Sequence, residues 1–217
     1  MTQQIIATGI AALADVDNDI AQAVDQLGIP SPRIRPAEFE AFLLAIVSQQ
    51  ISTPAARAIM GRVMTLLPEI SAQALLSQDD FSLRNAGLSL RKIEYAKGLA
   101  AAVVTGRFDI DSLAAMDDAE AIKVITSLRG FGRWSAEIYL LLSLKRPDIF
   151  PADDLALLDA LKRLKKLPAR PSPKQARDLI AHWAPWRSVG SLLLWDYYRE
   201  TTMKTAQQHY TRDRQAG

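Results

Sequence analysis

Leu128-Arg129-Gly130-Phe131-Gly132-Arg133 is the stretch that decides the fold of this chain of 217 residues, because it joins two apolar helical segments through a short glycine hairpin. Glycines two positions apart let the backbone turn tightly, since a residue without a Cβ adopts conformations that other residues avoid. The turn exposes consecutive N–H groups at the start of the next helix, where the helix dipole favours an anion. The hairpin therefore predicts a binding place for a phosphate group.

Apolar residues recur at intervals of three and four along nearly the whole chain, and no sustained alternation indicates a strand. We therefore expect an all-α protein. The expected helices are Asp17–Leu27, Pro36–Gln50, Pro54–Leu66, Ser71–Ser77, Leu90–Thr105, Ile110–Ala115, Ala119–Leu128, Arg133–Leu144, Asp154–Lys166, Pro173–Trp183 and Arg187–Met203.

Residues with known preferences mark several helix ends. Thr53 and Ser172 each precede a proline and are expected to cap the next helix, and Asp117 has the capping-box spacing to Glu120. Glycines stand at four expected helix stops, Gly28, Gly87, Gly106 and Gly130. The loops at Ile29–Pro36 and Leu167–Pro173 are the main interruptions of the helical pattern.

Charge is distributed unevenly although the net charge is only +2, from 26 basic and 24 acidic residues. Between Asp159 and Asp178 the chain has no acidic residue and seven basic ones: Lys162, Arg163, Lys165, Lys166, Arg170, Lys174 and Arg177. Such a run is either a solvated helix face or a surface that faces nucleic acid, and composition leaves both open.

The absence of cysteine excludes disulfides, a thiolate nucleophile, cysteine zinc sites and iron–sulfur clusters. The only histidines, His182 and His209, lie far apart, so no metal-ligand spacing is present and we expect no catalytic metal. The N-terminus lacks a basic segment before its mildly apolar start, and no apolar run reaches membrane-spanning length. An intracellular, cytoplasmic protein is expected, associated with the nucleoid if the source is bacterial.

Four separated motifs, in order over roughly Pro36 to Tyr198, give the chain its family resemblance. They are Ser48-Gln49-Gln50-Ile51-Ser52, the hairpin with Trp134-Ser135-Ala136, the pair Asp153-Asp154, and His182-Trp183-Ala184-Pro185-Trp186-Arg187-Ser188. With Asp154 standing 22 positions after Gly132, the chain resembles the helix-hairpin-helix superfamily of DNA glycosylases, and within it the 3-methyladenine DNA glycosylase II branch of alkylpurine glycosylases.

The resemblance implies two helical domains with an active cleft between them. Residues 36–145 would form a helical barrel that carries the hairpin, and residues 1–35 with 146–217 would form a second domain that carries the catalytic aspartate. Helical periodicity alone does not reveal such a discontinuous division. The implied activity is hydrolysis of the N-glycosidic bond of 3-methyladenine and 7-methylguanine in duplex DNA, by base flipping, in base excision repair. A monomer is expected.

Asp154 is the expected catalytic residue and Asp153 is its nearest rival. An aspartate at a helix start is commonly a cap. With two adjacent aspartates, Asp153 can cap while Asp154 points into the cleft, and the resemblance assigns catalysis to the second. A fixed carboxylate would stabilise the positive charge that develops on the deoxyribose, or orient or deprotonate the attacking water. The sequence leaves these two roles open.

Aromatic residues are candidates for the walls of the base pocket, because alkylated purines are cationic and an aromatic face attracts a cation. By resemblance these are Trp134 and Trp195, with Tyr139 as a weaker match because the family's tyrosine aligns with Ile138. The alternative is that all three are core residues. Trp134 also stands where bifunctional relatives carry a Schiff-base lysine, so we expect no strand-cutting lyase activity.

The remaining assignments concern the grip on DNA. Gln50 is expected to fill the gap left by the extruded base, although two glutamines can simply end a helix. Phosphate contacts are expected from the N–H groups of Gly130 and Gly132, supported by Arg133. Arg187 is expected either to support the cleft or to contact phosphate. No cofactor is expected, apart from a monovalent cation that the family can hold at the hairpin when DNA is bound.

Two other functions stay open at this point. One keeps the enzyme class and changes the lesion to hypoxanthine, ethenoadenine or 1-methyladenine. The other is a helix-hairpin-helix module that binds DNA without catalysis.

Overall fold

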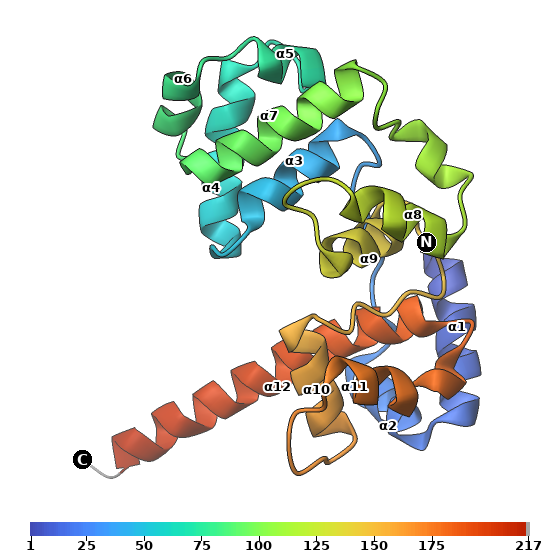
Figure 1. The fold of residues 1–217 in the computed structure, drawn as a ribbon. Helices are drawn as coiled ribbons and strands as arrows, with labels where there is room; N and C mark the ends of the chain where they lie inside the picture. Colours follow the sequence, from blue (N-terminus) through green and yellow to red (C-terminus); the bar gives the residue numbers. More distant parts are fainter. Residues whose placement is uncertain (216–217) are drawn as a thin grey trace. The chain divides into compact units, whose positions relative to one another are not determined.

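The computed structural model describes the backbone of residues 1–215 and the side chains of residues 1–204, so the side chain of His209 lies outside the described part. Over the described residues the chain is all-α, with short 3₁₀ turns and no strand, which confirms the expected fold class (Figure 1). None of the helices in this part is long and apolar enough to cross a membrane.

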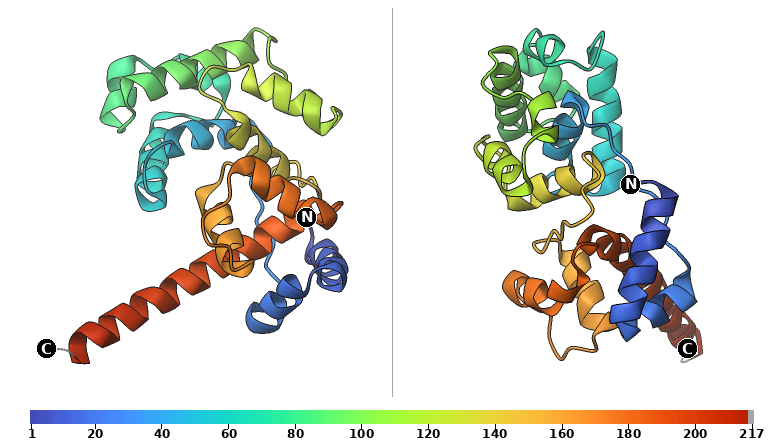
Figure 2. Two further views of the ribbon diagram at one scale, coloured as in Figure 1. Left: turned by 60° about the horizontal axis from the view of Figure 1, so that its bottom comes forward. Right: turned by 90° about the vertical axis from the view of Figure 1, so that its right-hand side faces the viewer.

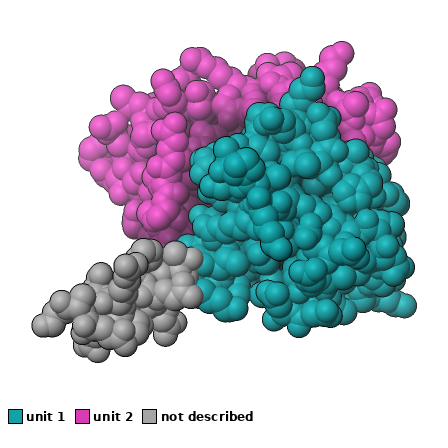
Figure 3. Space-filling model, turned by 90° about the horizontal axis from the view of Figure 1, so that it is seen from below, with its two compact units in different colours: residues 1–34, 145–217 teal, residues 35–144 magenta. Residues whose placement is uncertain are grey.

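The chain divides into two compact units, distinguished by colour in Figure 3. Unit 1 comprises residues 1–34 and 145–217, and unit 2 comprises residues 35–144. Unit 1 contains α1 (Gln3–Val16), α2 (Asn18–Leu27), α10 (Leu155–Leu164), α11 (Pro173–Leu179), η2 (Ala181–Trp183) and α12 (Arg187–Gln215). Unit 2 contains α3 (Phe39–Ser48), α4 (Thr53–Leu66), α5 (Ala72–Leu76), α6 (Asp80–Asn85), α7 (Leu90–Val104), η1 (Asp111–Ala114), α8 (Asp118–Thr126) and α9 (Arg133–Leu142).

In unit 1 the helices from the two ends of the chain pack together around α12, which contacts α1, α2 and α10 (Figures 1 and 2). The close approach of α1 depends on Gly9, because a Cβ there would lie 2.8 Å from side-chain atoms of both Trp186 and Val189. Glycine also weakens a helix locally. Neither α1 nor the short α6 is among the helices expected from the sequence.

In unit 2 the core is built around Phe42 of α3, whose side chain is buried. The rings of Phe108, Phe131 and Tyr139 lie with their centroids 5.2, 5.6 and 4.4 Å from that of Phe42. Edge and tilted contacts of this kind add to the stability that burial alone provides. Since Phe131 is the residue between the hairpin glycines, the core of unit 2 holds the hairpin in place.

The expected helix ends are mostly confirmed. Gly28, Gly87, Gly106 and Gly130 all have positive φ, as is common for a glycine that follows a helix. Ser172 caps α11 in a full capping box with Gln175, and Asp117 accepts a hydrogen bond from the Glu120 N–H. The expectation for Thr53 is wrong, because the cap of α4 is Ser52, whose hydroxyl accepts from the Ala55 N–H.

Candidate active site

Asp154 is the cap of helix α10. Its Oδ1 accepts hydrogen bonds from the N–H groups of Ala156 at 3.0 Å and Leu157 at 3.1 Å. Asp153 is exposed in the turn before it and does not cap this helix. The expectation that Asp153 caps this helix is therefore wrong. A carboxylate has two oxygens and several lone pairs, so capping through Oδ1 is compatible with a second role.

Trp195 of α12 meets the same carboxylate. Its Nε1–H donates to Asp154 Oδ1 over a long distance of 3.4 Å, and the side chain is only partly buried. The sequence gives two residues 41 positions apart, and packing of α10 on α12 brings them together. Three N–H groups thus converge on one oxygen, which fixes the orientation of the carboxylate before any substrate binds.

The segment that leads to Asp154 is anchored to the start of α12. Arg187 Nε and Nη2 donate to the two carboxylate oxygens of Asp148 at 2.7 and 2.6 Å. Burial works to raise the pKa of Asp148, but the hydrogen bonds and charge of Arg187 lower it overall. Ser188 adds a second tie, because its hydroxyl accepts from the Ile149 N–H at 2.8 Å. Arg187 therefore supports the chain in front of Asp154.

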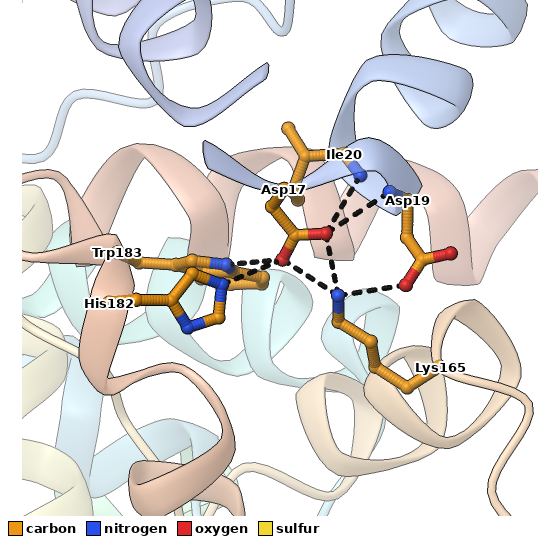
Figure 4. Close-up of polar contacts among 6 residues, drawn as sticks. All are labelled: Asp17, Asp19, Ile20, Lys165, His182 and Trp183. Carbon is orange, nitrogen blue, oxygen red and sulfur yellow. Dashed lines mark hydrogen bonds and ion pairs between the residues drawn. The ribbon is translucent and has the colours of Figure 1, made fainter. Parts of the chain in front are cut away.

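The far end of α10 is held by a buried carboxylate, Asp17 (Figure 4). Asp17 caps α2, accepts from Lys165 Nζ at 2.6 and 2.7 Å, and accepts from Trp183 Nε1 at 2.7 Å. His182 Nε2 lies 3.2 Å from Oδ2 of the same group. Burial tends to raise the pKa of Asp17, but the hydrogen bonds from Lys165 and Trp183 and the charge of Lys165 lower it to about 2. Lys165 is the cap residue at the C-terminal end of α10, so this cluster fixes that end of the helix.

Two of the seven basic residues between Asp159 and Asp178 form ion pairs within unit 1. Lys165 is paired with Asp17 and Asp19, and Arg170 is paired with Asp159 at 2.7 and 2.8 Å. Lys165, which is 16% exposed, therefore holds unit 1 together and is not a solvated charge. Arg170 is 46% exposed, so its pairing with Asp159 balances a charge that stays at the surface.

The hairpin is built in unit 2 from Gly130, Phe131 and Gly132. Gly130 has φ +94°, and a Cβ at this position would lie 2.4 Å from the ring of Tyr95, so only glycine fits. Gly132 is different, because its φ is −103° and a Cβ there would meet nothing within 4 Å. The protein itself thus requires the first glycine and leaves open space at the second.

Gly132 is the residue before α9, at its N-cap position, and no side chain caps this helix with a hydrogen bond. The first N–H groups of a helix lack partners within the helix, so this end is suited to an anion. Arg133, the first residue of α9, has its Nε 2.8 Å from Glu137 Oε1 one turn later. Its side chain is 57% exposed, so the guanidinium keeps an outward face, although Glu137 already balances part of its charge.

Gln50 stands in the turn between α3 and α4, exposed and with φ +58°. A left-handed backbone is unfavourable for a residue with a Cβ, and strained residues of this kind cluster at functional sites. The neighbouring Gln49 does not merely end the helix, because its Nε2 donates to the Gly130 carbonyl at 2.8 Å. Lys92 holds the end of α3 just before this turn, since its Nζ donates to the Val47 carbonyl at 2.8 Å. The structure thus joins the Gln50 turn to the hairpin.

The expected aromatic residues differ in their surroundings. Trp134 lies in the first turn of α9 and is 39% exposed, which suits contact with a ligand. Tyr139 is 6% exposed, and its hydroxyl donates to the Ala37 carbonyl at 2.8 Å. Burial and the charge of Asp111 raise the pKa of Tyr139 to about 12. The cavity beside it, lined also by Phe42 and Phe131, is about 20 Å³, enough for about one water molecule and not for a base. The structure therefore makes Tyr139 a core residue.

Trp183 and Trp186 have packing roles in unit 1. Trp183 is fully buried, with its ring edge-on to Phe150, and Trp186 packs against Gly9. The sequence did not reveal Gln49 and Tyr95 as supports of the hairpin, or Lys92 as a support of the segment before Gln50. Only Gln49 carried a signal, since it lies within a matched motif; the other two act through contacts distant in sequence.

No group of three or more histidine, cysteine or carboxylate side chains within the described residues is arranged to hold a metal ion. The hairpin carbonyls are partly engaged: Leu128 O accepts from the Phe131 N–H, and Gly130 O accepts from Gln49. A carbonyl oxygen has a second lone pair, so each of these atoms can accept one further contact.

Comparison with known proteins identifies the family. Residues 43–185 match the HhH-GPD superfamily of base excision DNA repair proteins. The chain is 30% identical to DNA-3-methyladenine glycosylase 1 of Schizosaccharomyces pombe over 161 residues, which cover 72% of this chain and 71% of that protein.

Solved structures give the same result. The 3-methyladenine DNA glycosylase of S. pombe in complex with abasic DNA superposes with a TM-score of 0.80 at 28% identity, over 87% of this chain and 95% of that one. The DNA-3-methyladenine glycosidase of Bacillus halodurans gives a TM-score of 0.77 at 31% identity, over 86% and 87%. The chain therefore belongs to the HhH-GPD superfamily of base excision DNA repair proteins.

Proposed function

We propose that this protein is a monofunctional DNA glycosylase that hydrolyses the N-glycosidic bond of alkylated purines, chiefly 3-methyladenine and 7-methylguanine, in duplex DNA. The observation that carries the proposal is the carboxylate of Asp154, oriented by two backbone N–H groups and the Trp195 indole, in a chain of this superfamily. The related proteins of S. pombe and B. halodurans are named for 3-methyladenine, which supports this substrate class.

The chemistry needs few groups, because an alkylated purine is cationic and already a good leaving group. As the bond to the base breaks, positive charge develops on the deoxyribose, and a preorganised carboxylate stabilises it without reorganisation. The same group can orient or deprotonate the attacking water. Trp134 and Trp195 would offer aromatic faces to the flipped cationic base.

The grip on DNA would come from unit 2. The N–H groups at the start of α9 would contact phosphate, with Arg133 beside them, and Gln50 would fill the gap left by the flipped base. A monovalent cation, if recruited with the DNA, would be held by the carbonyls of Leu128 and Gly130 and would add positive charge beside the phosphate. A single bound copy of the protein is sufficient for this scheme.

Trp134 supports hydrolysis without strand cutting. An indole cannot form a Schiff base, and the product would be an abasic site in an intact strand. Treatment with borohydride during turnover should therefore trap no covalent protein–DNA adduct. A trapped adduct would contradict the monofunctional assignment.

The test compares Asp154→Asn with Asp153→Asn. Asparagine caps helices as well as aspartate does, so Asp154→Asn should keep α10 intact while it removes the charge. Methylated duplex DNA is incubated with each protein, and the released bases are identified by chromatography. We expect release by the wild type and Asp153→Asn, and a loss of at least about a hundredfold in Asp154→Asn.

Other outcomes are equally informative. Full activity in Asp154→Asn would remove this residue from the mechanism. No release by the wild type, with duplex binding retained, would favour another lesion or a non-catalytic module. A panel with hypoxanthine, ethenoadenine and 1-methyladenine would then separate those two.

A further inference from the structure

The indole of Trp195 is contacted by a second residue besides Asp154. Arg33, in the segment between α2 and α3, lies with its Cζ 5.3 Å from the centroid of the Trp195 ring. Its Nη2 donates to Asp196 Oδ1 at 2.8 Å. Asp196 follows Trp195 directly on α12, so Asp196 holds the guanidinium while it covers the ring of the preceding residue.

The two contacts of the indole are complementary. Asp154 accepts from the Nε1–H at the edge of the ring, and Arg33 lies against its face. A rotation of the indole that breaks the hydrogen bond to Asp154 would also displace the ring from under the guanidinium. The distance of 3.4 Å from Nε1 to Oδ1 is long for a hydrogen bond, so the pair needs such support.

The positive charge of Arg33 also favours the hydrogen bond from Trp195 to Asp154. A cation over an aromatic face is attracted by the negative charge of that face, and it leaves the edge of the ring more positive. The Nε1–H of Trp195 lies on that edge and faces an anionic acceptor. The positive charge of Arg33 therefore strengthens the contact to Asp154 that its position preserves.

We propose that Arg33 is a positioning residue, which holds the Trp195 indole in the orientation in which it donates to Asp154. The proposal rests on the proposed function in so far as Asp154 is the catalytic carboxylate. Its structural part stands separately, because the contacts among Arg33, Trp195 and Asp154 can be measured without any substrate.

The first experiment measures the indole itself. The Nε1–H signal of Trp195 is observed by ¹⁵N NMR and assigned by its loss in Trp195→Phe. Arg33→Met, which keeps the length of the side chain but removes its charge, should move this signal upfield as the hydrogen bond weakens. Arg33→Lys should restore part of the shift. An unchanged signal in Arg33→Met would overturn the proposal.

Arg199→Met is the matched control. Arg199 is the other partner of Asp196, at 3.1 Å, so this variant also removes an arginine from the same aspartate. It should leave the Trp195 signal in place. A shift as large as that in Arg33→Met would mean that Asp196, not the cation over the ring, controls the indole, and the proposal would fail.

The second experiment measures catalysis by a double-mutant cycle. In single-turnover release of 7-methylguanine, Arg33→Met should slow the reaction about threefold to fivefold, the size expected for a partly exposed cation–π contact. In the Trp195→Phe background, which has no N–H to donate, the same change should have no further effect. An undiminished effect there would overturn the proposal and indicate that Arg33 contacts phosphate directly.

Failure of the proposed function is distinguishable from failure of this inference. If the wild type releases no alkylated base, the function is wrong and the NMR result alone decides the role of Arg33. If the wild type is active but the cycle shows no coupling between Arg33 and Trp195, the function stands and the inference fails.

Discussion

Substitutions at the two hairpin glycines can distinguish an effect on DNA binding from an effect on folding stability. Gly130→Ala forces a φ of +94° on a residue with a Cβ and brings that atom 2.4 Å from the Tyr95 ring. Backbone strain of this kind costs about 1–3 kcal/mol, to which the displacement of Tyr95 is added. Gly132→Ala meets neither penalty, since its φ is −103° and the space beside it is open. Its free energy of unfolding should change by less than about 1 kcal/mol, and it can rise.

The expected effect of Gly132→Ala on DNA binding is much larger than its effect on folding. If a phosphate approaches the N–H groups at the start of α9, a methyl group at this position obstructs it. Loss of one hydrogen bond to a charged group costs about 1.5–3 kcal/mol, which corresponds to roughly a tenfold to hundredfold weaker affinity. Phosphate contacts carry no sequence information, so undamaged and damaged duplexes should lose affinity alike.

The measurements are urea unfolding of both variants and fluorescence anisotropy with an undamaged duplex and one that contains an abasic site. We expect Gly132→Ala to unfold like the wild type and to bind both duplexes more weakly. Gly130→Ala serves as the contrast, since it should lose stability in the absence of DNA. Wild-type affinity in Gly132→Ala, or a loss confined to the damaged duplex, would refute the assignment of this helix start to the phosphate.

Three further predictions follow from the contacts. The pKa of Asp17 is lowered from 3.8 to about 2, so the ionised group should contribute about 2 kcal/mol to the free energy of unfolding above pH 4, and this contribution should be lost as the pH falls toward 2. The difference in unfolding free energy between the wild type and Asp17→Asn should therefore shrink between about pH 4 and pH 2. A difference that stays constant would contradict this prediction. Arg187→Met should slow base release with little effect on duplex affinity, because it removes the hydrogen bonds that hold Asp148. Weaker duplex binding, with the slope of log affinity against log salt concentration reduced by about one, would instead show that Arg187 contacts phosphate. Gln50→Gly should leave the free energy of unfolding unchanged or raise it by up to about 1 kcal/mol, because glycine adopts a positive φ without strain. The same variant should release the base more slowly. Unimpaired release would show that Gln50 does not fill the gap left by the flipped base.

Local features of the fold were open to prediction because their causes are local. A positive φ at Gly130 or a cap at Ser172 follows from the residue and its immediate neighbours. The helix at Gln3–Val16 is the informative exception. Its start, capped by Thr2, has a weak local signal, and it is stabilised by packing of Gly9 against Val189 of α12, 180 positions later in the chain. Such contacts also define unit 1, which helical periodicity cannot reveal.

The residues that support the candidate site show the same limit. Lys92 and Tyr95 lie on α7, with nothing in their surrounding sequence to connect them to the hairpin or to the Gln50 turn. Asp17 is recognisable as a helix cap, but its contacts with Lys165 and Trp183 span about 150 residues or more. The family motifs name residues that would meet the substrate. The residues that hold them are specified by three-dimensional packing.

Asp154 shows why a capping role and a catalytic role need not compete. From the sequence, an aspartate at a helix start has two interpretations, and the neighbouring Asp153 invites their separation onto two residues. The structure gives the cap to Asp154 itself. The N–H groups of Ala156 and Leu157 fix the carboxylate relative to α10, the Asp17 cluster fixes the other end of that helix, and Arg187 fixes the chain in front of it. A carboxylate that must stabilise a short-lived positive charge gains from being immobile, because no free energy is then spent on reorienting it during the reaction. On this argument the cap is part of the proposed catalytic device, and a helix start is a suitable place for it.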